Sequence, residues 1–184
     1  MIELVDLDNT IKLDIRYATK DNFMGRPVYG QARAFLQPAA AERARRAHQK
    51  LGEKGLGIVV YDGYRPWSVT KLFWEFLPDD KRKFVADPAR GSNHNRGCAI
   101  DLGLFELATG QSLPMPSGYD EFTRRASPDY TGGTDEERSN RDILRRIMEA
   151  EGFTVNAEEW WHFDLIGSER YHIYDLSFSE IPKH

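Results

Sequence analysis

Two histidines and two acids have the types and spacing that suit metal-assisted hydrolysis. His94 precedes Asp101 by seven residues, and His162 closes the short element Glu159-Trp160-Trp161-His162. Two histidines and one carboxylate form a common catalytic zinc set, which leaves a fourth tetrahedral position for water or substrate. Zinc lowers the pKa of that water towards ~7, but a base must still take its proton. Glu159, three residues before His162, is close enough in sequence to approach the same metal without binding it.

The same residues also allow a purely structural interpretation. Asp101 lies in an apolar run between Ile100 and Leu102, where a buried carboxylate needs a cation or a metal as compensation. An arginine could supply that cation, and both histidines would then be ordinary core or rim residues. No His-Glu-x-x-His segment is present in the sequence, which excludes the common zinc-protease motif. Residue types and spacing alone leave the metal site and the structural alternative equally open.

The remaining histidines have other surroundings. His48 falls in the polar part of a predicted helix and His184 is the last residue, so we expect both in solvent. His172 stands among tyrosines near the end of the chain, where we expect a packing or surface role. The single cysteine, Cys98, excludes an intramolecular disulfide and a cysteine-rich metal site.

Three helices are predicted around these motifs. The first spans 38–51, because proline suits a first turn and four small or apolar residues share one face, namely Ala40, Ala44, Ala47 and Leu51. The second spans 68–77 and ends at Pro78. The third begins with Thr134 and Glu137, which have the spacing of a capping box, and ends at Gly152.

Short apolar runs between and after the helices predict strands. These runs are LGIVVYDGYRP, read as a buried strand that ends in a loop at Gly63 and Pro66, and CAIDLGLF, FTV, WWHFDLI and YHIYDL. The connections between the late runs are too short for crossover helices, which favours antiparallel pairing. We therefore expect an α+β fold, a single domain over 1–184 with a mixed or antiparallel sheet flanked by helices. The loop region 107–133 is long enough to suggest a function of its own.

Composition narrows the class of protein. A chain of 184 residues, 40% hydrophobic and 29% charged, is typical of one globular domain. The 25 Lys and Arg against 29 Asp and Glu give a net charge of −4, which argues against a nucleic-acid partner. We find no apolar window of ~18 residues and no long apolar stretch near the N-terminus. The sequence therefore predicts a cytoplasmic protein with no membrane partner.

Taken together, these residues are similar to a known family of zinc peptidases. The pattern S-x-H-x-x-G-x-A-x-D followed by E-x-x-H resembles the zinc D-alanyl-D-alanine dipeptidases, and it is carried by Ser92, His94, Gly97, Ala99, Asp101, Glu159 and His162. The likeness extends over RYATKDNF (16–23) and YDGYRP (61–66), so it covers most of the chain. It implies the fold of the D,D-carboxypeptidases and hedgehog-like zinc peptidases, and it favours the metal site over the structural alternative.

The resemblance also implies a role for each catalytic position. His94, Asp101 and His162 match the ligands of one zinc ion per chain. Glu159 matches the general base, which deprotonates water and passes the proton to the leaving amine. Arg65, in the segment Asp-Gly-Tyr-Arg-Pro, matches the arginine that stabilises the oxyanion, with a structural salt bridge as the alternative.

Further positions concern the substrate. By resemblance, Tyr17 and Asp120 bind its amino end, whereas Ser92 either faces its carboxylate or braces the loop of His94. The sequence departs from the expected pattern at Gln31, where an aromatic residue is more familiar, and at Pro116. We expect these departures to affect the carboxylate end of the substrate site and not the zinc chemistry.

The implied activity is hydrolysis of the free dipeptide D-Ala-D-Ala to two D-alanines. A D,D-carboxypeptidase that trims peptidoglycan stem peptides is the alternative within the same enzyme class, and it would require an open cleft and export. A zinc-stabilised binding module without activity is a third interpretation, which the presence of both Glu159 and Arg65 weakens. The only partner expected is a small dipeptide, and the sequence does not indicate an oligomeric state.

Overall fold

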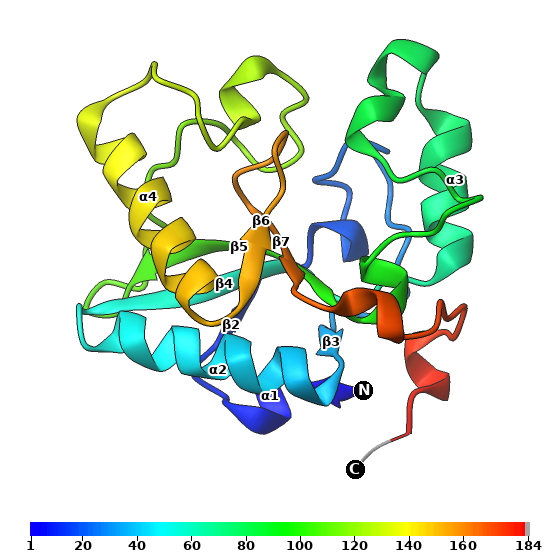
Figure 1. The fold of residues 1–184 in the computed structure, drawn as a ribbon, viewed down its shortest axis with the longest axis horizontal. Coiled ribbons are helices and arrows are strands. Elements are labelled where there is room, and N and C mark those ends of the chain that lie inside the picture. The colour runs from blue at the N-terminus through cyan, green and yellow to red at the C-terminus, as the bar shows by residue number, and fades with distance from the viewer. Residues whose placement is uncertain (183–184) are drawn as a thin grey trace.

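A five-stranded mixed sheet runs through the centre of the protein (Figure 1). In this computed structural model, which describes residues 1–182, the strands follow the order β2 (Lys12–Leu13), β4 (Leu56–Asp62), β5 (Ala99–Glu106), β7 (His162–Leu165) and β6 (Phe153–Val155). β2 is parallel to β4 and the other neighbours are antiparallel. A separate antiparallel pair joins β1 (Ile2–Glu3) to β3 (Phe35–Leu36). The predicted α+β fold with a mixed sheet is confirmed.

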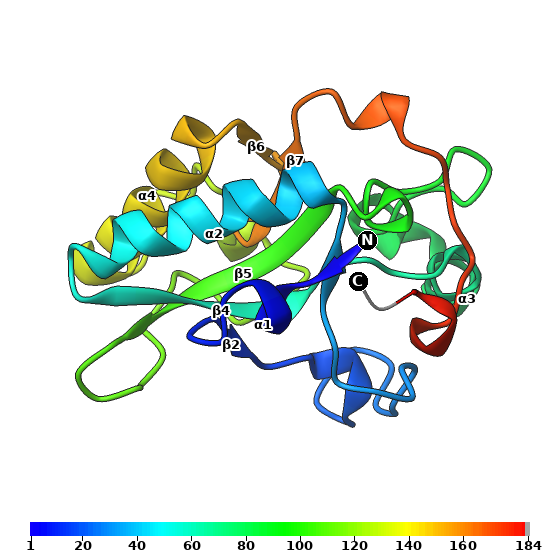
Figure 2. The same cartoon turned by 90° about the horizontal axis from the view of Figure 1, so that it is seen from below.

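Two long helices, α2 (Pro38–Gly52) and α4 (Asp135–Ala150), cover one face of this sheet (Figure 2). The small residues predicted for the inner face of α2 are all buried, so the helix backbone lies close to β4. The short α1 (Leu4–Leu7) contacts α2, whereas α3 (Trp67–Phe76) stands apart from α2 and α4 (Figure 1). The predicted bounds of all three long helices differ from the observed ones by at most two residues.

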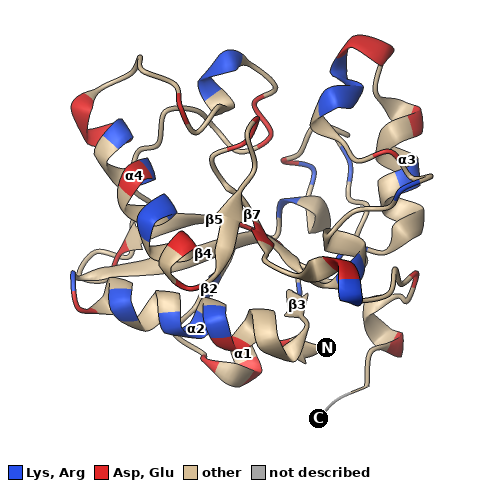
Figure 3. Ribbon diagram, in the orientation of Figure 1, with Lys and Arg blue, Asp and Glu red and all other residues tan. Residues whose placement is uncertain are grey.

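A local signal accounts for the start of α4, and a contact with α2 holds its end. Thr134 Oγ1 accepts a hydrogen bond from the Glu137 amide at 3.1 Å, and Glu137 Oε2 accepts one from the Thr134 amide at 2.7 Å. This arrangement is the predicted capping box. At the other end, the buried Glu151 carboxylate binds Arg46 and Lys50 of α2, so the two helices are joined. Lys and Arg predominate among the charged residues of α2, whereas α4 carries both acidic and basic residues (Figure 3).

The strands β4 and β5 supply the rigid floor of the site. Residues Ala99 to Phe105 of β5 are all buried, as are the last six residues of β4. Asp62 is the cross-strand partner of Asp101, and Asp101 is the partner of His162. Direct partners in a sheet point to the same face. Three polar side chains therefore form one row across β4, β5 and β7.

Two expectations from the sequence are wrong. The run YHIYDL forms no strand, because its backbone bonds go to two separate segments. The Tyr174 amide donates to the Asn95 carbonyl in the turn before β5, and the Tyr174 carbonyl accepts from the Trp67 amide at the start of α3. His48 is buried and not solvated, although His172 is exposed as expected. His184 lies outside the described residues. Within residues 1–182, no helix is both long and apolar enough to cross a bilayer.

The buried His48 makes stability sensitive to pH. Its Nδ1 accepts a hydrogen bond from the Ile58 amide at 3.1 Å, so the proton is on Nε2, which lies 2.9 Å from the Thr10 hydroxyl. Burial lowers the pKa of His48 below its ordinary value of 6.5, partly opposed by Asp8. The unfolded chain therefore takes up more protons as the pH falls through 6.5, and His48 contributes less to the free energy of unfolding.

A comparison of the wild type with His48→Asn tests this effect. The asparagine side-chain oxygen can accept the bond from Ile58 but does not titrate. The stability advantage of the wild type is expected to shrink as the pH falls from about 7.5 to about 5.5, measured by urea unfolding at each pH. A difference that does not change with pH would contradict this account of His48.

Candidate functional site

His94, Asp101 and His162 meet at one end of the buried sheet. Asp101 on β5 and His162 on β7 are direct cross-strand partners. His94 belongs to the short turn His94–Arg96 before β5, where Gly97 reverses the chain with a φ of +67°, a conformation that favours glycine. One potential ligand atom from each of the three residues lies within 4.8 Å of the others. The sheet register and one glycine turn therefore bring the three side chains together.

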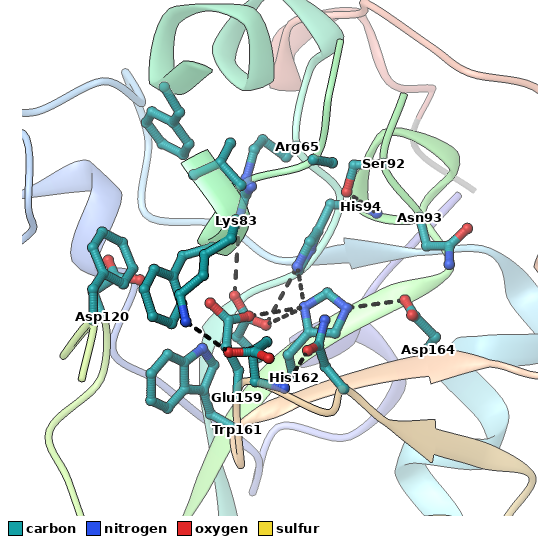
Figure 4. Close-up of a pocket in the computed structure, with 18 of the residues that line it drawn as sticks. Arg65, Lys83, Ser92, Asn93, His94, Asp120, Glu159, Trp161, His162 and Asp164 are labelled. Carbon is teal, nitrogen blue, oxygen red and sulfur yellow. Dashed lines mark hydrogen bonds and ion pairs between the residues drawn. The ribbon is translucent and has the colours of Figure 1, made fainter. Parts of the chain in front are cut away.

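The three facing atoms are close to tetrahedral spacing. His94 Nε2 lies 3.0 Å from His162 Nδ1, and Asp101 Oδ1 lies 3.0 Å from His162 Nδ1 and 3.3 Å from His94 Nε2. Zinc bonds of about 2.0–2.1 Å at tetrahedral angles place ligand atoms about 3.3 Å apart. The rings of the two histidines point towards each other, and the acid Asp164 lies on the far side of His162 (Figure 4).

Hydrogen bonds outside the cluster leave its inner atoms free for a cation. His94 Nδ1 donates to the Gly63 carbonyl at 2.6 Å, and His162 Nε2 donates to Asp164 Oδ1 at 3.0 Å. These partners leave the lone pairs of His94 Nε2 and His162 Nδ1 directed inwards. Asp101 Oδ1 is buried and has no hydrogen-bond partner among the described residues. Three converging lone pairs are unfavourable without a positive charge between them, so the donor set fits a metal ion.

The charges around the two histidines also favour a bound cation. Burial opposes the charge on His162, yet Asp164 and Asp101 raise its pKa well above the ordinary value. Burial likewise opposes ionisation of Asp101, but the adjacent His94 and His162 hold its pKa far below the usual range. Without a metal, this field favours a proton on His162 Nδ1, and a bound cation would replace that proton and leave the lone pair for coordination.

Glu159 stands beside this cluster and is not part of it. It lies in the turn before β7, where the His162 amide donates to the Glu159 carbonyl at 3.3 Å. Its carboxylate oxygen Oε2 is 4.0 Å from His162 Nδ1, and the side chain is 11% exposed. Burial raises the pKa of Glu159 to about 8. A cation between the three neighbouring side chains would lower that pKa and keep Glu159 ionised at neutral pH.

Arg65 is held rigidly next to the cluster. Asp62, at the end of β4, accepts hydrogen bonds from Arg65 Nε at 2.9 Å and from Nη2 at 2.8 Å. The other oxygen of Asp62 accepts from the Tyr29 hydroxyl at 2.9 Å. Arg65 Nη2 lies 3.8 Å from Asp101 Oδ2, and the Arg65 amide donates to the His94 carbonyl. The guanidinium is therefore both salt-bridged and directed at the site.

A second polar group lies further along the same cavity. Tyr17 donates from its hydroxyl to Asp120 Oδ1 at 3.1 Å, whereas the buried Oδ2 of Asp120 has no hydrogen-bond partner among the described residues. Burial, together with the nearby Glu159 and Asp101, raises the pKa of Asp120 well above its ordinary value. The backbone of Asp120 has a φ of +57°, which is strained for a residue other than glycine. A cationic group from a ligand would compensate this acid.

One cavity of about 300 Å³ is lined by His94, Asp101 and His162 together with Glu159, Arg65, Tyr17 and Asp120. Figure 4 shows Asp120 at one side of it, Asp164 at the other and Glu159 between them. Five acids line the cavity, namely Asp101, Asp120, Glu158, Glu159 and Asp164, against three cationic side chains, Arg65, Lys83 and Arg96. A cavity of this size and charge suits a metal ion together with a small, positively charged ligand.

A comparison with known proteins decides the family. A family model described as D-ala-D-ala dipeptidase, of the M15 peptidases, matches residues 1–184. The chain belongs to the D-Ala-D-Ala dipeptidase family. The D-alanyl-D-alanine dipeptidase of Escherichia coli K12 is 35% identical over 180 residues, which cover 96% of this chain and 92% of the relative. The one from Enterococcus faecalis is 36% identical over 174 residues, which cover 85% and 86%.

The matches among solved structures are more distant from this member of the dipeptidase family. A vancomycin-resistance D,D-dipeptidase in complex with a D-Ala-D-Ala phosphinate analogue aligns with a TM-score of 0.46 and 22% identity. That alignment covers 79% of this chain and 55% of the other.

For this dipeptidase family member, the structure brings together every site residue expected from the sequence. Asp120 comes from the loop region 107–133, whose length suggested a function. Ser92 lines the cavity, but its hydroxyl accepts from the His94 amide at 3.1 Å, so it braces the His94 loop. Gln31 lines a different hollow, and the Pro116 carbonyl binds Arg125. The metal, catalytic and substrate roles of the site residues stay predictions.

Sequence reasoning missed three residues of the site. Asp62 holds Arg65, Asp164 binds the outer nitrogen of His162, and Tyr119 donates to Asp101 Oδ2 at 3.0 Å. Each has a signal in the sequence. Asp62 and Asp164 are acids within apolar strands, and Tyr119 directly precedes the predicted anchor Asp120. A carboxylate in a buried strand needs a compensating partner, and the reasoning that singled out Asp101 therefore applies to Asp62 and Asp164 as well.

Proposed function

We propose that this protein hydrolyses the free dipeptide D-Ala-D-Ala to two D-alanines, with one zinc ion bound per chain. The observation that carries the proposal is the cavity itself. Three inward ligand atoms lie at one point of it, and the carboxylate of Glu159 lies 4.0 Å from one of them. Further along it lies Asp120 Oδ2, which has no hydrogen-bond partner among residues 1–182. Membership of the dipeptidase family and relatives at 35% and 36% identity support the same activity.

His94, Asp101 and His162 would hold the zinc ion. Two nitrogens and one oxygen form a donor set that zinc accepts, with a fourth position left for water or substrate. When bound, zinc supplies a Lewis acid that lowers the pKa of water and polarises a carbonyl group. The partly buried Asp164 and the Gly63 carbonyl fix the ring orientations of the two histidines by binding their outer nitrogens.

Glu159 moves the proton. Its carboxylate stands beside the three ligand atoms, so it can accept a proton from an attacking water. The same carboxyl group can then donate that proton to the amine that leaves as D-alanine. Glu159 is only 8% exposed as a whole residue, which limits exchange of this proton with solvent between the two transfers.

Arg65 stabilises the negative charge that forms on the carbonyl oxygen. Two hydrogen bonds to Asp62 hold the guanidinium in place. Arg65 therefore does not need to reorient when negative charge develops on the carbonyl oxygen. An arginine stays charged at any physiological pH and presents several donors in one plane. The salt bridge to Asp62 is therefore the support for this role, and the two interpretations of Arg65 are compatible.

Asp120 and Tyr17 give selectivity for a free amino end. The unpartnered carboxylate oxygen of Asp120 can bind the substrate ammonium, and Tyr17 holds the other oxygen in place. Peptidoglycan stem peptides carry an amide at that position and would leave Asp120 uncompensated. This argument favours the dipeptidase over the D,D-carboxypeptidase alternative, and a cytoplasmic location remains a prediction.

The experiment is a comparison of two substrates with the purified protein and with Asp120→Asn. The wild type should release D-alanine from D-Ala-D-Ala and leave N-acetyl-D-Ala-D-Ala almost untouched. Asp120→Asn should raise KM for the free dipeptide and reduce this preference by about 10- to 100-fold, because a charged hydrogen bond contributes about 1.5–3 kcal/mol. Equal hydrolysis of both substrates by the wild type would favour the carboxypeptidase, and hydrolysis of neither would favour the inactive module.

A further inference from the structure

The two carboxylate oxygens of Asp101 have different surroundings. Oδ2 accepts a hydrogen bond from the Tyr119 hydroxyl at 3.0 Å. Oδ1 lies 3.0 Å from His162 Nδ1 and 3.3 Å from His94 Nε2, and it has no hydrogen-bond partner among the described residues. Only one oxygen of Asp101 is thus directed at the proposed metal position, and Tyr119 occupies the other.

Tyr119 is well placed to fix this arrangement. Its ring packs on Tyr61 with centroids 4.8 Å apart and on the edge of Trp161 at 5.5 Å. Trp161 directly precedes His162 in the chain. The same aromatic packing therefore supports His162, one predicted ligand, and Tyr119, which contacts the other predicted ligand Asp101. Arg65 Nη2, at 3.8 Å from Asp101 Oδ2, is too far for a hydrogen bond. Tyr119 is the hydrogen-bond donor to Asp101 Oδ2 among the described residues.

We propose that Tyr119 is a positioning residue of the metal centre, which holds Asp101 so that it binds the metal through Oδ1 alone. The terminal torsion of an aspartate is broad, so a carboxylate without this bond can turn. Turning would bring Oδ2 towards the metal and occupy the position needed by water or substrate. Partners of this kind change metal affinity by about 10- to 100-fold. The inference rests on the proposed zinc-dependent function.

Tyr119→Phe tests the proposal, because it removes the hydroxyl and keeps the ring. Tyr61→Phe is the matched control, since it removes a hydroxyl from the neighbouring ring that lies against Gly103 and not against Asp101. Zinc affinity of each metal-free protein is measured by competition with a chromogenic chelator. Tyr119→Phe is expected to bind zinc about 10- to 100-fold more weakly, and Tyr61→Phe as tightly as the wild type.

Two further measurements separate this role from a structural one. If Tyr119 only stabilises the fold, its loss lowers the melting temperature of the metal-free protein and leaves zinc affinity unchanged, and that result would overturn the proposal. In protein loaded with cobalt(II), Tyr119→Phe should alter the visible absorption bands, which report the coordination of the metal, whereas Tyr61→Phe should not.

Failure of the inference and failure of the proposed function give different results. Wild-type zinc affinity in Tyr119→Phe, with D-Ala-D-Ala hydrolysis by the wild type intact, overturns only the role of Tyr119. Weakened zinc binding in Tyr119→Phe supports that role even if the wild type does not hydrolyse D-Ala-D-Ala. A wild type that binds no zinc overturns both.

Discussion

Replacement of Glu159 by glutamine is expected to reduce kcat for D-Ala-D-Ala by about 10²- to 10⁴-fold while zinc remains bound. Glutamine keeps the size of the side chain but cannot accept a proton from water. The Glu159 carboxylate lies 4.0 Å from His162 Nδ1 and is not one of the three converging ligand atoms, so its loss should leave the metal in place. The loss should appear in kcat more than in KM, because the proton moves only in the transition state.

D-alanine release and zinc content are measured on the same protein sample. Glu75→Gln is the matched control, because this acid on α3 is exposed, pairs with Lys71 at 3.8 Å and does not line the cavity. An exposed ion pair contributes little, so the control should keep its activity and its zinc. Full activity in Glu159→Gln with zinc bound would remove Glu159 from the mechanism. Loss of zinc from that variant would instead make it a ligand.

Asp101→Asn is expected to abolish both stoichiometric zinc binding and hydrolysis. The change keeps the shape of the side chain and removes the negative charge that the two histidines face at 3.0 and 3.3 Å. An amide oxygen without a full charge is a weaker ligand for a divalent cation. The loss of affinity should exceed the 10- to 100-fold expected on removal of an outer partner such as the Tyr119 hydroxyl.

Equilibrium dialysis followed by metal analysis measures this effect. Asp142→Asn, on the outer side of α4, is a suitable control, because Asp142 is exposed and far from the site in the fold. The control should retain zinc and activity. An Asp101→Asn protein that keeps one zinc ion per chain would show that Asp101 is not a ligand.

The elements that the sequence predicted well are those with local signals. The alanine face of α2, the capping box of α4 and the buried β4 depend on residues close together in the chain. The prediction of a strand at YHIYDL was wrong because the backbone of this run bonds to residues far away in the chain. A local pattern of apolar residues cannot reveal such contacts. The prediction that His48 lies in solvent was wrong for a related reason, since its partner Thr10 comes from another part of the chain.

The set of site residues followed from the resemblance, whereas their arrangement required the fold. The row from Asp62 through Asp101 to His162 depends on the register of three strands, and that register is set by long-range pairing. The supporting role of Tyr119 depends on where the loop 107–133 returns to the sheet. Neither can be derived from spacing along the chain.

A crystal of the zinc-loaded protein, with anomalous diffraction recorded at the zinc absorption edge, tests the central claim most directly. The account predicts one anomalous peak about 2.0–2.2 Å from His94 Nε2, Asp101 Oδ1 and His162 Nδ1. A zinc ion bound elsewhere, or bound without one of these three atoms, would contradict it.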